Sequence, residues 1–314
     1  MTQKILVIGG VAAGPKAAAR ARRMAPDAEI TILERGSLVS YAGCGMPFYL
    51  AGEVSKYDML FETTYGVIRN ADYFWREKGC KLLTRNEAKA IRRDKKEVLV
   101  EKLEIGEQYT LPYDKLVLAT GSTPFIPPIE GLDLKGVHRL NHPDDVQAIK
   151  KSLEETGVDE VIVIGSGLIG IEVVDALSKL HLFTTVVELQ DHVLPGLLDP
   201  DMGAWLGRKL EDAGVEFKFG HKVLRIEGDE NGNVTSVVTD KERLDAQMVI
   251  ISVGVRPNVD LARAAGLEIG KTGAIAVNEY LQTSDPDIYA LGDCVENTNL
   301  ITGLKQYVPL ASTA

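Results

Sequence analysis

The chain has 314 residues, of which 45% are hydrophobic and 25% charged, a globular composition with enough length for two domains. Its net charge of −10 is the opposite of the basic excess that nucleic-acid binding requires, so we expect no nucleic-acid partner. No apolar run approaches the ~20 residues of a membrane span, and the N-terminal residues leave no room for a signal peptide. Three scattered cysteines are too few for a disulfide framework, and the five histidines are dispersed. We therefore expect a cytoplasmic protein with reduced thiols and no metal site.

A strand, a glycine-rich turn and a helix follow one another at the N-terminus. Residues 5–8 are apolar β-formers, residues 9–14 are Gly-Gly-Val-Ala-Ala-Gly, and residues 16–24 are rich in alanine. This context indicates a dinucleotide fingerprint, whose turn and helix N-terminus bind a pyrophosphate, although Val11 replaces the middle glycine. Glu34 ends the next strand, 20 residues (34 − 14) after the last glycine, where a carboxylate accepts hydrogen bonds from a ribose. The candidate cofactor residues are Gly9, Gly10, Ala12, Ala13, Gly14, Glu34 and Arg35.

A second unit of the same kind lies in the middle of the chain. Residues 161–164 form an apolar run, and the following Gly-Ser-Gly-Leu-Ile-Gly turn has all three glycines before a helix that reaches residue 180. The next strand, 184–187, ends in Glu188, 18 residues (188 − 170) after the last glycine. One such motif is weak evidence, but two motifs that each have an acid strongly favour two dinucleotide sites. The candidates here are Gly165, Gly167, Leu168, Ile169, Gly170 and Glu188.

Short strands with turn signals follow each unit. The turns at residues 94–96 and 231–233 indicate hairpins, and the apolar strands that end near Gly121 and Gly254 come after them. Prolines at 124, 127 and 128 mark a connection between domains, after which Asp144 is the expected N-cap of a helix that reaches Thr156.

These patterns predict an α/β fold with two Rossmann-like dinucleotide-binding domains, the second inserted in the first. Each would have three layers, with a central parallel sheet and a small antiparallel sheet. Residues 1–120 and 248–314 would form the first domain and residues 121–247 the second. The strand in residues 287–293 should return to the first domain.

The stretch 40–47, Ser-Tyr-Ala-Gly-Cys-Gly-Met-Pro, places a lone cysteine between two glycines. Cys44 is a candidate redox group, because a thiolate carries out disulfide exchange. Cys80 and Cys294 are expected to be small packing residues.

With these pieces placed, the chain resembles the FAD-dependent pyridine nucleotide–disulfide oxidoreductases. Five of that family's signatures occur in order: the N-terminal glycine turn, Ala119-Thr120-Gly121, the second glycine turn, Gly254-Val255-Arg256-Pro257-Asn258 and Leu291-Gly292-Asp293. The resemblance implies that the first domain binds FAD, with Asp293 hydrogen-bonded to the ribitol, and that the inserted domain binds NAD(P)H. It adds Thr120, Gly121, Gly254, Gly292 and Asp293 to the candidate cofactor residues.

Within that family the chain resembles the branch with a single cysteine, because Ser40 stands where other members have a second one. That branch includes coenzyme A disulfide reductases, NADH oxidases and peroxidases, and persulfide reductases. The resemblance makes Cys44 and Ser40 the candidate catalytic residues. Its coenzyme A side implies that Arg20, Arg22 and Arg23 contact coenzyme A phosphates; a solvated helix end is the alternative. Gly43 departs from the asparagine that is often found there.

The resemblance implies that electrons pass from NADH to FAD and then to Cys44, with a small disulfide, persulfide or peroxide as substrate. Glu188 favours NADH, since a carboxylate repels the 2′-phosphate of NADPH, the alternative donor. Three functions stay open: a disulfide or persulfide reductase, an NADH oxidase or peroxidase with a cysteine sulfenic acid, and a flavin–NAD module without thiol catalysis.

Relatives continue beyond the Gly-Asp motif into a C-terminal interface domain that forms the homodimer. The chain ends at residue 314, where that part should begin. We therefore expect the dimerisation domain to be absent, FAD to bind loosely and activity to be low.

Overall fold

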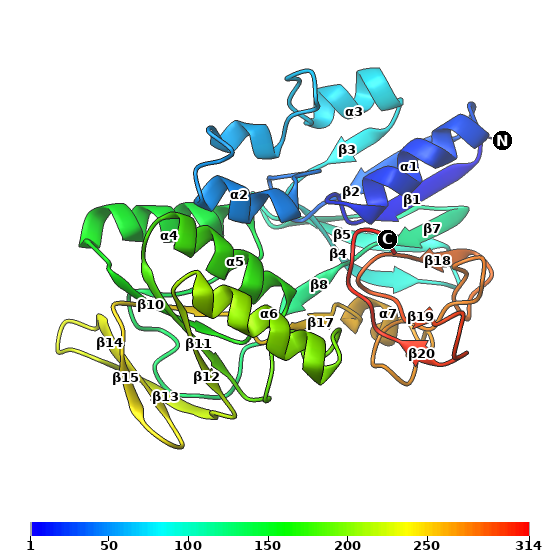
Figure 1. The fold of residues 1–314 in the computed structure, drawn as a ribbon. Coiled ribbons are helices and arrows are strands. Elements are labelled where there is room, and N and C mark those ends of the chain that lie inside the picture. The colour runs from blue at the N-terminus through cyan, green and yellow to red at the C-terminus, as the bar shows by residue number, and fades with distance from the viewer. Residues whose placement is uncertain (1, 314) are drawn as a thin grey trace. The chain divides into compact units, whose positions relative to one another are not determined.

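The computed structural model describes residues 2–313, and Figure 1 shows their course from the N-terminus to the C-terminus. The chain divides into two compact units. The first unit comprises Met1–Tyr41, Phe61–Thr123 and Arg256–Ala314, and the second comprises Ala42–Leu60 and Pro124–Val255. The stretch Ala42–Leu60, which the sequence analysis placed within residues 1–120, thus belongs by its contacts to the second unit.

A five-stranded parallel sheet forms the centre of the first unit, in the order β18-β7-β1-β2-β3. Its strands are apolar because a parallel sheet is covered on both faces, and Val7 of β1 is fully buried. The return of β18 to this sheet confirms the expected return of residues 287–293. The strands are β1 (Lys4–Ile8), β2 (Glu29–Leu33), β3 (Lys81–Leu83), β7 (Lys115–Leu118) and β18 (Ile288–Ala290).

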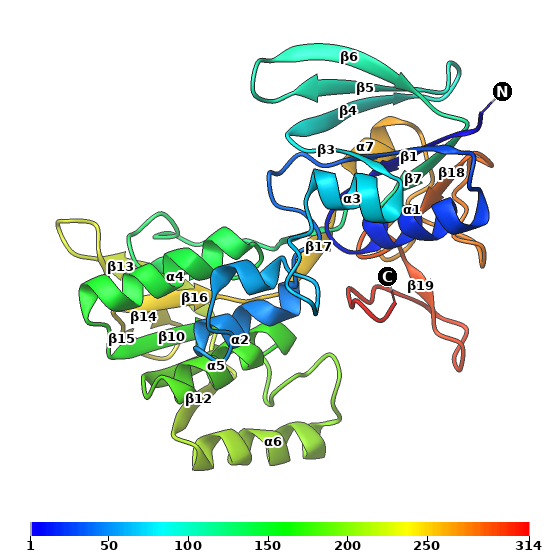
Figure 2. The same cartoon turned by 90° about the horizontal axis from the view of Figure 1, so that it is seen from above.

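Two further layers cover this sheet (Figure 2). On one face, Val7 packs in a core with Ala18 of α1 and Phe74 of α3. On the other face, Leu6 belongs to a core with Val98 of β5 and with side chains of α7. Alternate residues of β1 therefore serve opposite cores. The covering elements are α1 (Ala13–Met24), α3 (Ala71–Lys78), α7 (Asp260–Ala264) and the antiparallel strands β4 (Asn86–Arg92), β5 (Glu97–Lys102) and β6 (Glu107–Pro112).

The second unit repeats this architecture. Its parallel sheet has the order β12-β11-β10-β16-β9, and the antiparallel sheet β13-β14-β15 contributes Ile226, Val234 and Val237 to a core with Ile162 and Val249. The strands are β9 (Val137–Arg139), β10 (Glu160–Ile164), β11 (Phe183–Glu188), β12 (Val215–Phe219), β13 (Val223–Gly228), β14 (Val234–Thr239), β15 (Arg243–Asp245) and β16 (Met248–Ile251). The helices are α4 (Pro143–Thr156), α5 (Leu168–Lys179) and α6 (Pro200–Asp212).

The strand orders show that the two units are copies of one design. Strands β18, β7, β1, β2 and β3 correspond in position to β9, β16, β10, β11 and β12. The strand at one edge differs in its place along the chain: β18 is the last strand of the first parallel sheet, whereas β9 is the first strand of the second. The predicted α/β fold with two Rossmann-like domains is confirmed, whereas β9 was not predicted, because its three residues contain no apolar run.

The smaller elements connect these layers. The chain crosses between the units in β8 (Ser122–Pro124) and β17 (Val255–Pro257), which pair with each other. The stretch Ala42–Leu60 contains the 3₁₀ turns Gly43–Gly45 and Tyr57–Leu60 and the short helix α2 (Met46–Leu50). A hairpin of β19 (Asn297–Thr298) and β20 (Lys305–Gln306) follows β18.

The start of α4 differs from the prediction. His142, not Asp144, is the N-cap, and its ring accepts a hydrogen bond from the Asp144 backbone N–H. The Asp145 carboxylate accepts a hydrogen bond from the His142 backbone N–H at 2.8 Å, which completes a capping box. Pro143 fits the first helical position because it has no N–H to leave unpaired there.

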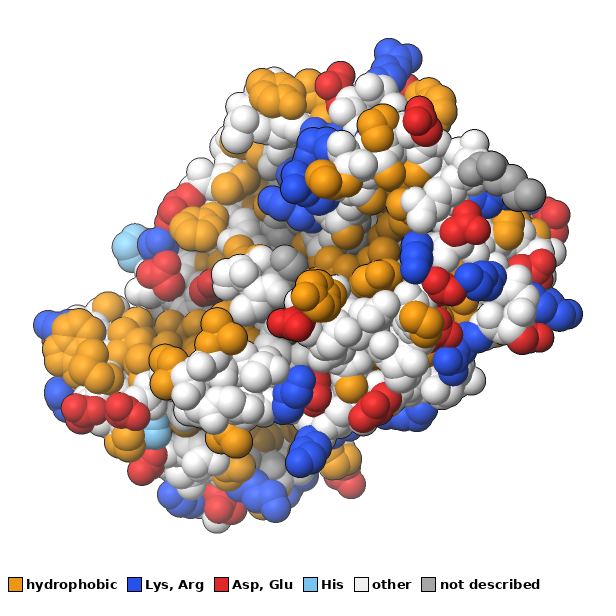
Figure 3. All heavy atoms as spheres, turned by 90° about the vertical axis from the view of Figure 1, so that its right-hand side faces the viewer, with side chains coloured by type: hydrophobic (Ala, Val, Ile, Leu, Met, Phe, Trp, Pro, Cys, Tyr) orange, Lys and Arg blue, Asp and Glu red, His pale blue; other side chains and the backbone are white. Residues whose placement is uncertain are grey.

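On the face of the molecule in Figure 3, acidic and basic side chains are interspersed with apolar and uncharged ones. Among residues 2–313, no helix is both long enough and apolar enough to cross a membrane.

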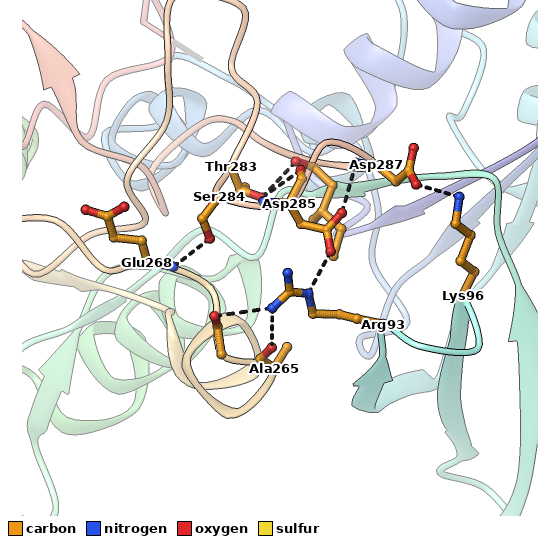
Figure 4. Close-up of polar contacts among 10 residues, drawn as sticks. Arg93, Lys96, Ala265, Glu268, Thr283, Ser284, Asp285 and Asp287 are labelled. Atoms are coloured by element: carbon orange, nitrogen blue, oxygen red, sulfur yellow. Dashed lines mark hydrogen bonds and ion pairs between the residues drawn. The ribbon is translucent and has the colours of Figure 1, made fainter.

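A polar network joins the β4–β5 turn to the loop before β18 (Figure 4). Arg93 Nε donates a hydrogen bond of 2.6 Å to Asp285 Oδ2, and Arg93 Nη1 lies 3.4 Å from the carbonyl oxygens of Ala265 and Gly266. Lys96 forms an ion pair of 2.5 Å with Asp287. These contacts fix the loop from which β18 enters the sheet.

We expect Arg93→Ala to lower the free energy of unfolding by about 1 kcal/mol, because the Arg93 side chain is 37% exposed and the pair is only partly shielded from water. Arg92→Ala is the matched control, because Arg92 is the exposed neighbour of Arg93 and makes no such contact with the loop. Its loss of unfolding free energy should stay below about 0.5 kcal/mol. Urea unfolding measures both. Equal losses in the two variants would contradict the role given to Arg93.

Candidate functional site

The first glycine turn is shaped by close approaches of the backbone. Gly9 has φ +115° and donates its backbone N–H to Leu33 O at 2.8 Å. A Cβ on Gly9 would lie 2.0 Å from Ala119 O, and a Cβ on Gly14 would lie 2.0 Å from Gly9 O. Both positions therefore require glycine, as the fingerprint predicts.

Glu34 holds this turn from the end of β2. Its Oε2 accepts a hydrogen bond from Gly10 N at 2.7 Å, and its Oε1 accepts one from Gly36 N at 2.7 Å. Each carboxylate oxygen keeps a further lone pair for a ligand hydroxyl. Glu34 thus orders the turn and presents an acceptor at the same time.

The second turn is built in the same way. Gly165 has φ +99° and donates to Val187 O at 2.9 Å, and a Cβ on Gly170 would lie 2.2 Å from Gly165 O. Glu188 Oε2 accepts hydrogen bonds of 2.8 Å from both the backbone N–H and the hydroxyl of Ser166, and its Oε1 accepts one from Gln190 N. Glu188 is almost completely buried. The role of Ser166 was not predicted, because it occupies a variable position of the fingerprint.

The second turn leaves room for a phosphate, and the helices after both turns begin without a side-chain cap. A Cβ on Gly167 would meet no atom within 4 Å, so the backbone there is open to a ligand. The N-caps of α1 and α5, Ala12 and Gly167, make no side-chain capping bond. Free N–H groups at the start of these helices are suited to the pyrophosphate of a dinucleotide. Leu168 and Ile169 are the first residues of α5, and Ala13 is the first of α1.

Two of the sequence signatures bind each other within the first unit. Thr120 Oγ1 donates to Asn258 O at 2.6 Å, and Asn258 Nδ2 donates to Thr120 O at 2.8 Å. The backbone N–H of Asn258 donates to Gly121 O, where Gly121 has φ +68°. Asn258 belongs to the signature at residues 254–258, and no role was predicted for it.

Asp293 lies three residues after β18, behind Gly292 (φ +77°). Ser122 Oγ donates a hydrogen bond of 3.0 Å to Asp293 Oδ2. Burial raises the pKa of Asp293, and the bond from Ser122 opposes this effect. Asp293 is therefore a partly buried acceptor at the carboxyl ends of the parallel strands, where open α/β sheets bind ligands.

Cys44 lies in the second unit, on the 3₁₀ turn before α2, and is exposed. Ser40 lies in the first unit, has φ +48° and donates its N–H to Gly10 O at 2.9 Å. Cys80 and Cys294 are buried, as expected of packing residues, and burial raises the pKa of both thiols.

The stretch that carries Cys44 is held within the second unit from several sides. The backbone bond from Ala42 N to Leu60 O closes its two ends at 2.8 Å, and α2 packs against α4 and α5. Tyr57 Oη donates to Asp144 Oδ1 at 3.3 Å; burial and then the Asp144 carboxylate raise the pKa of Tyr57 to about 12. Lys179 pairs with Glu53. The stretch that carries Cys44 therefore packs against α5, the helix that begins at the second glycine turn.

The three candidate arginines lie on α1 but differ in their contacts. Arg22 donates from Nε and Nη2 to Gly79 O at 3.1 and 2.6 Å, and from Nη1 to Pro26 O at 2.6 Å. Its guanidinium is thus engaged with backbone carbonyls. Arg20 and Arg23 are both exposed.

The remaining candidate cofactor residues are Arg35 in the first unit and Gly254 in the second. Arg35 is exposed beside Glu34, and Gly254 has φ +100° in the second unit. Among residues 2–313, no cluster of three His, Cys, Asp or Glu side chains has the geometry of a metal site.

A family model for pyridine nucleotide-disulphide oxidoreductases matches residues 3–314. The chain belongs to this family. An "NADH oxidase" of Methanocaldococcus jannaschii is 38% identical over 312 residues, which are 99% of this chain and 67% of the relative. An "NAD(P)H coenzyme A polysulfide/persulfide reductase" of Pyrococcus horikoshii is 35% identical, again over 99% of this chain and 67% of the relative. The chain thus spans about two thirds of the length of these curated relatives.

Among solved structures, the NAD-dependent persulfide reductase from A. fulgidus superposes with a TM-score of 0.95 at 41% identity. The match covers 99% of this chain and 57% of that one. The chain accordingly groups with the flavin- and NAD(P)H-dependent oxidoreductases that include NADH oxidases and coenzyme A persulfide reductases. Binding of FAD and NAD(P)H is typical of this family. The two glycine turns, which have no space for a Cβ at their first and last glycines, are suited to two dinucleotides.

Proposed function

We propose that the chain transfers two electrons from NADH through FAD to a disulfide or persulfide substrate by means of Cys44. The observation that carries the proposal is the exposed thiol of Cys44 on a chain that has two similar glycine turns, one held by Glu34 and the other by Glu188. Two dinucleotide sites suit a hydride donor and a flavin, and the thiol suits a sulfur substrate.

We assign FAD to the first unit and NADH to the second. Asp293, Thr120 and Gly121 lie in the first unit together with Gly9–Gly14 and Glu34, which supports a flavin there. The second unit has all three glycines of the fingerprint and open space at Gly167. This assignment follows the predicted domains 1–120 with 248–314 and 121–247, except that Ala42–Leu60 and residues 248–255 lie in the second unit.

FAD, when bound, supplies the acceptor for the hydride of NADH and the donor of two electrons to sulfur. In the proposed reaction, the Cys44 thiolate attacks one sulfur of the substrate. A Cys44–S–S–R bond forms, the substrate S–S bond breaks, and RS⁻ leaves. Two electrons and one proton then cleave the mixed disulfide, which restores the Cys44 thiolate and releases RSH. NADH becomes NAD⁺ in the same turnover.

Coenzyme A is the substrate carrier that the arginines support best. Arg20 and Arg23 are available on α1 to contact phosphates, whereas the Arg22 guanidinium binds the carbonyls of Gly79 and Pro26. The Pyrococcus relative is named as a coenzyme A polysulfide/persulfide reductase. Arg22 thus serves mainly to hold α1, and its neighbours are the stronger candidates.

An NADH oxidase is the second candidate, because the Methanocaldococcus relative carries that name. In that reaction Cys44 would cycle through a sulfenic acid with oxygen or a peroxide as acceptor. The exposure of Cys44 suits both chemistries.

Cys44→Ser tests the role of the thiol. We expect the variant to lose NADH-dependent reduction of coenzyme A disulfide by at least about 100-fold, since the attacking sulfur is gone, while NADH–dye reduction through FAD stays within about twofold. Cys80→Ser is the control at a buried thiol. Retained disulfide reduction in Cys44→Ser would rule out both thiol functions. The intact mass of the unreduced protein distinguishes the reductase from the oxidase. Added coenzyme A or one added sulfur on Cys44 supports the reductase, and one added oxygen supports the oxidase.

The donor preference follows from Glu188. Both of its oxygens accept hydrogen bonds from the protein, and the next residues, Leu189 and Gln190, offer no cation for a 2′-phosphate. We expect kcat/KM to be at least about tenfold higher for NADH than for NADPH, and Glu188→Ala to narrow this ratio. Glu211→Ala, at an exposed acid on α6, is the control and should leave the ratio unchanged. A wild-type preference for NADPH would contradict the assignment.

A further inference from the structure

Tyr307, directly after β20, has a buried hydroxyl without a hydrogen-bond partner among the described residues. Within residues 2–313, one other side-chain atom is in this state, His138 Nε2 on β9 of the second unit. A buried hydroxyl without a partner costs free energy, so it does not stabilise the folded protein in the absence of a ligand. A ligand that pairs with the hydroxyl would recover that loss.

The surroundings of the Tyr307 hydroxyl are the polar groups of the Asp293 site. Burial raises the pKa of Tyr307, and the negative charge of Asp293 raises it further. Ser122 opposes this rise in the pKa, but its hydroxyl donates its proton to Asp293, and the phenol hydroxyl itself has no hydrogen-bond partner among residues 2–313. The phenol therefore stays protonated at neutral pH and is an unused donor.

Asp293 is the complementary unused acceptor. Ser122 supplies one hydrogen bond to its Oδ2, whereas a carboxylate has about four lone-pair sites. One unpaired donor and one under-used acceptor thus lie near each other at the carboxyl ends of β7 and β18. A ligand with several neighbouring hydroxyl groups, each both donor and acceptor, satisfies both.

We propose that Tyr307 is a flavin-binding residue, whose hydroxyl donates a hydrogen bond to the ribityl chain of FAD while Asp293 accepts one from it. The inference rests on the proposed assignment of FAD to the first unit. It adds a residue from the segment after the β19–β20 hairpin, which no fingerprint in the sequence marks.

The test compares Tyr307→Phe with the wild type in FAD-free protein, by flavin fluorescence titration and by thermal unfolding. We expect the Kd for FAD to rise about three- to tenfold, because one hydrogen bond to the ligand is lost. The Tm of the FAD-free variant should be unchanged or higher, because the variant removes a polar group that has no partner. FMN, which also has a ribityl chain, should lose affinity by a similar factor, and ADP, which has none, should not.

Tyr109→Phe is the matched control in the same unit. Tyr109 Oη donates a 2.7 Å hydrogen bond to Asn86 Oδ1, so this variant should lower the Tm and leave the Kd for FAD unchanged. An unchanged Kd for FAD in Tyr307→Phe, a lower Tm of its FAD-free form, or an equal loss for ADP would each overturn the inference. A wild type that binds no FAD would overturn the proposed function as well, so the two failures are distinguishable.

Discussion

The bond between an acid at the end of the second strand and the backbone of the glycine turn is the contact on which both units depend. Glu34 binds Gly10 N and Gly36 N, and Glu188 binds Ser166 N and Gln190 N. The turns need φ values near +100° and approaches that exclude a Cβ. A carboxylate that accepts two backbone N–H groups holds such a turn in place before any ligand arrives, which reduces the ordering cost of binding.

The repeat of this contact gives one chain two turns that are suited to dinucleotides. The two sheets have corresponding strand orders, and β18 completes the first sheet only after the second unit has been inserted. The thiol does not follow this repeat: Ala42–Leu60 leaves the first unit and is held by α4 and α5. The stretch with Cys44 therefore packs on the helix whose N-terminus forms the second glycine turn.

Much of the fold could be predicted because its signals are local. Buried parallel strands are apolar runs, and Gly9, Gly14, Gly165 and Gly170 stand at spacings that only a strand–turn–helix explains. The contacts that sequence reasoning missed join residues far apart in the chain. Ser166 has no distinctive spacing, because its partner Glu188 is brought to it by tertiary structure, and the burial of the Tyr307 hydroxyl is likewise set by tertiary structure. The capping role of His142 was missed because histidine is an uncommon N-cap and Asp144 fits the usual preference.

The central claim is that each acid serves one dinucleotide. The direct measurement is isothermal titration of FAD and of NADH onto Glu34→Gln and Glu188→Gln, with folding checked by thermal unfolding. The account predicts that Glu34→Gln weakens FAD at least about tenfold and leaves NADH unchanged, and that Glu188→Gln does the reverse. If both variants weakened both ligands equally, or if the pattern were exchanged, the assignment of the two units would be contradicted.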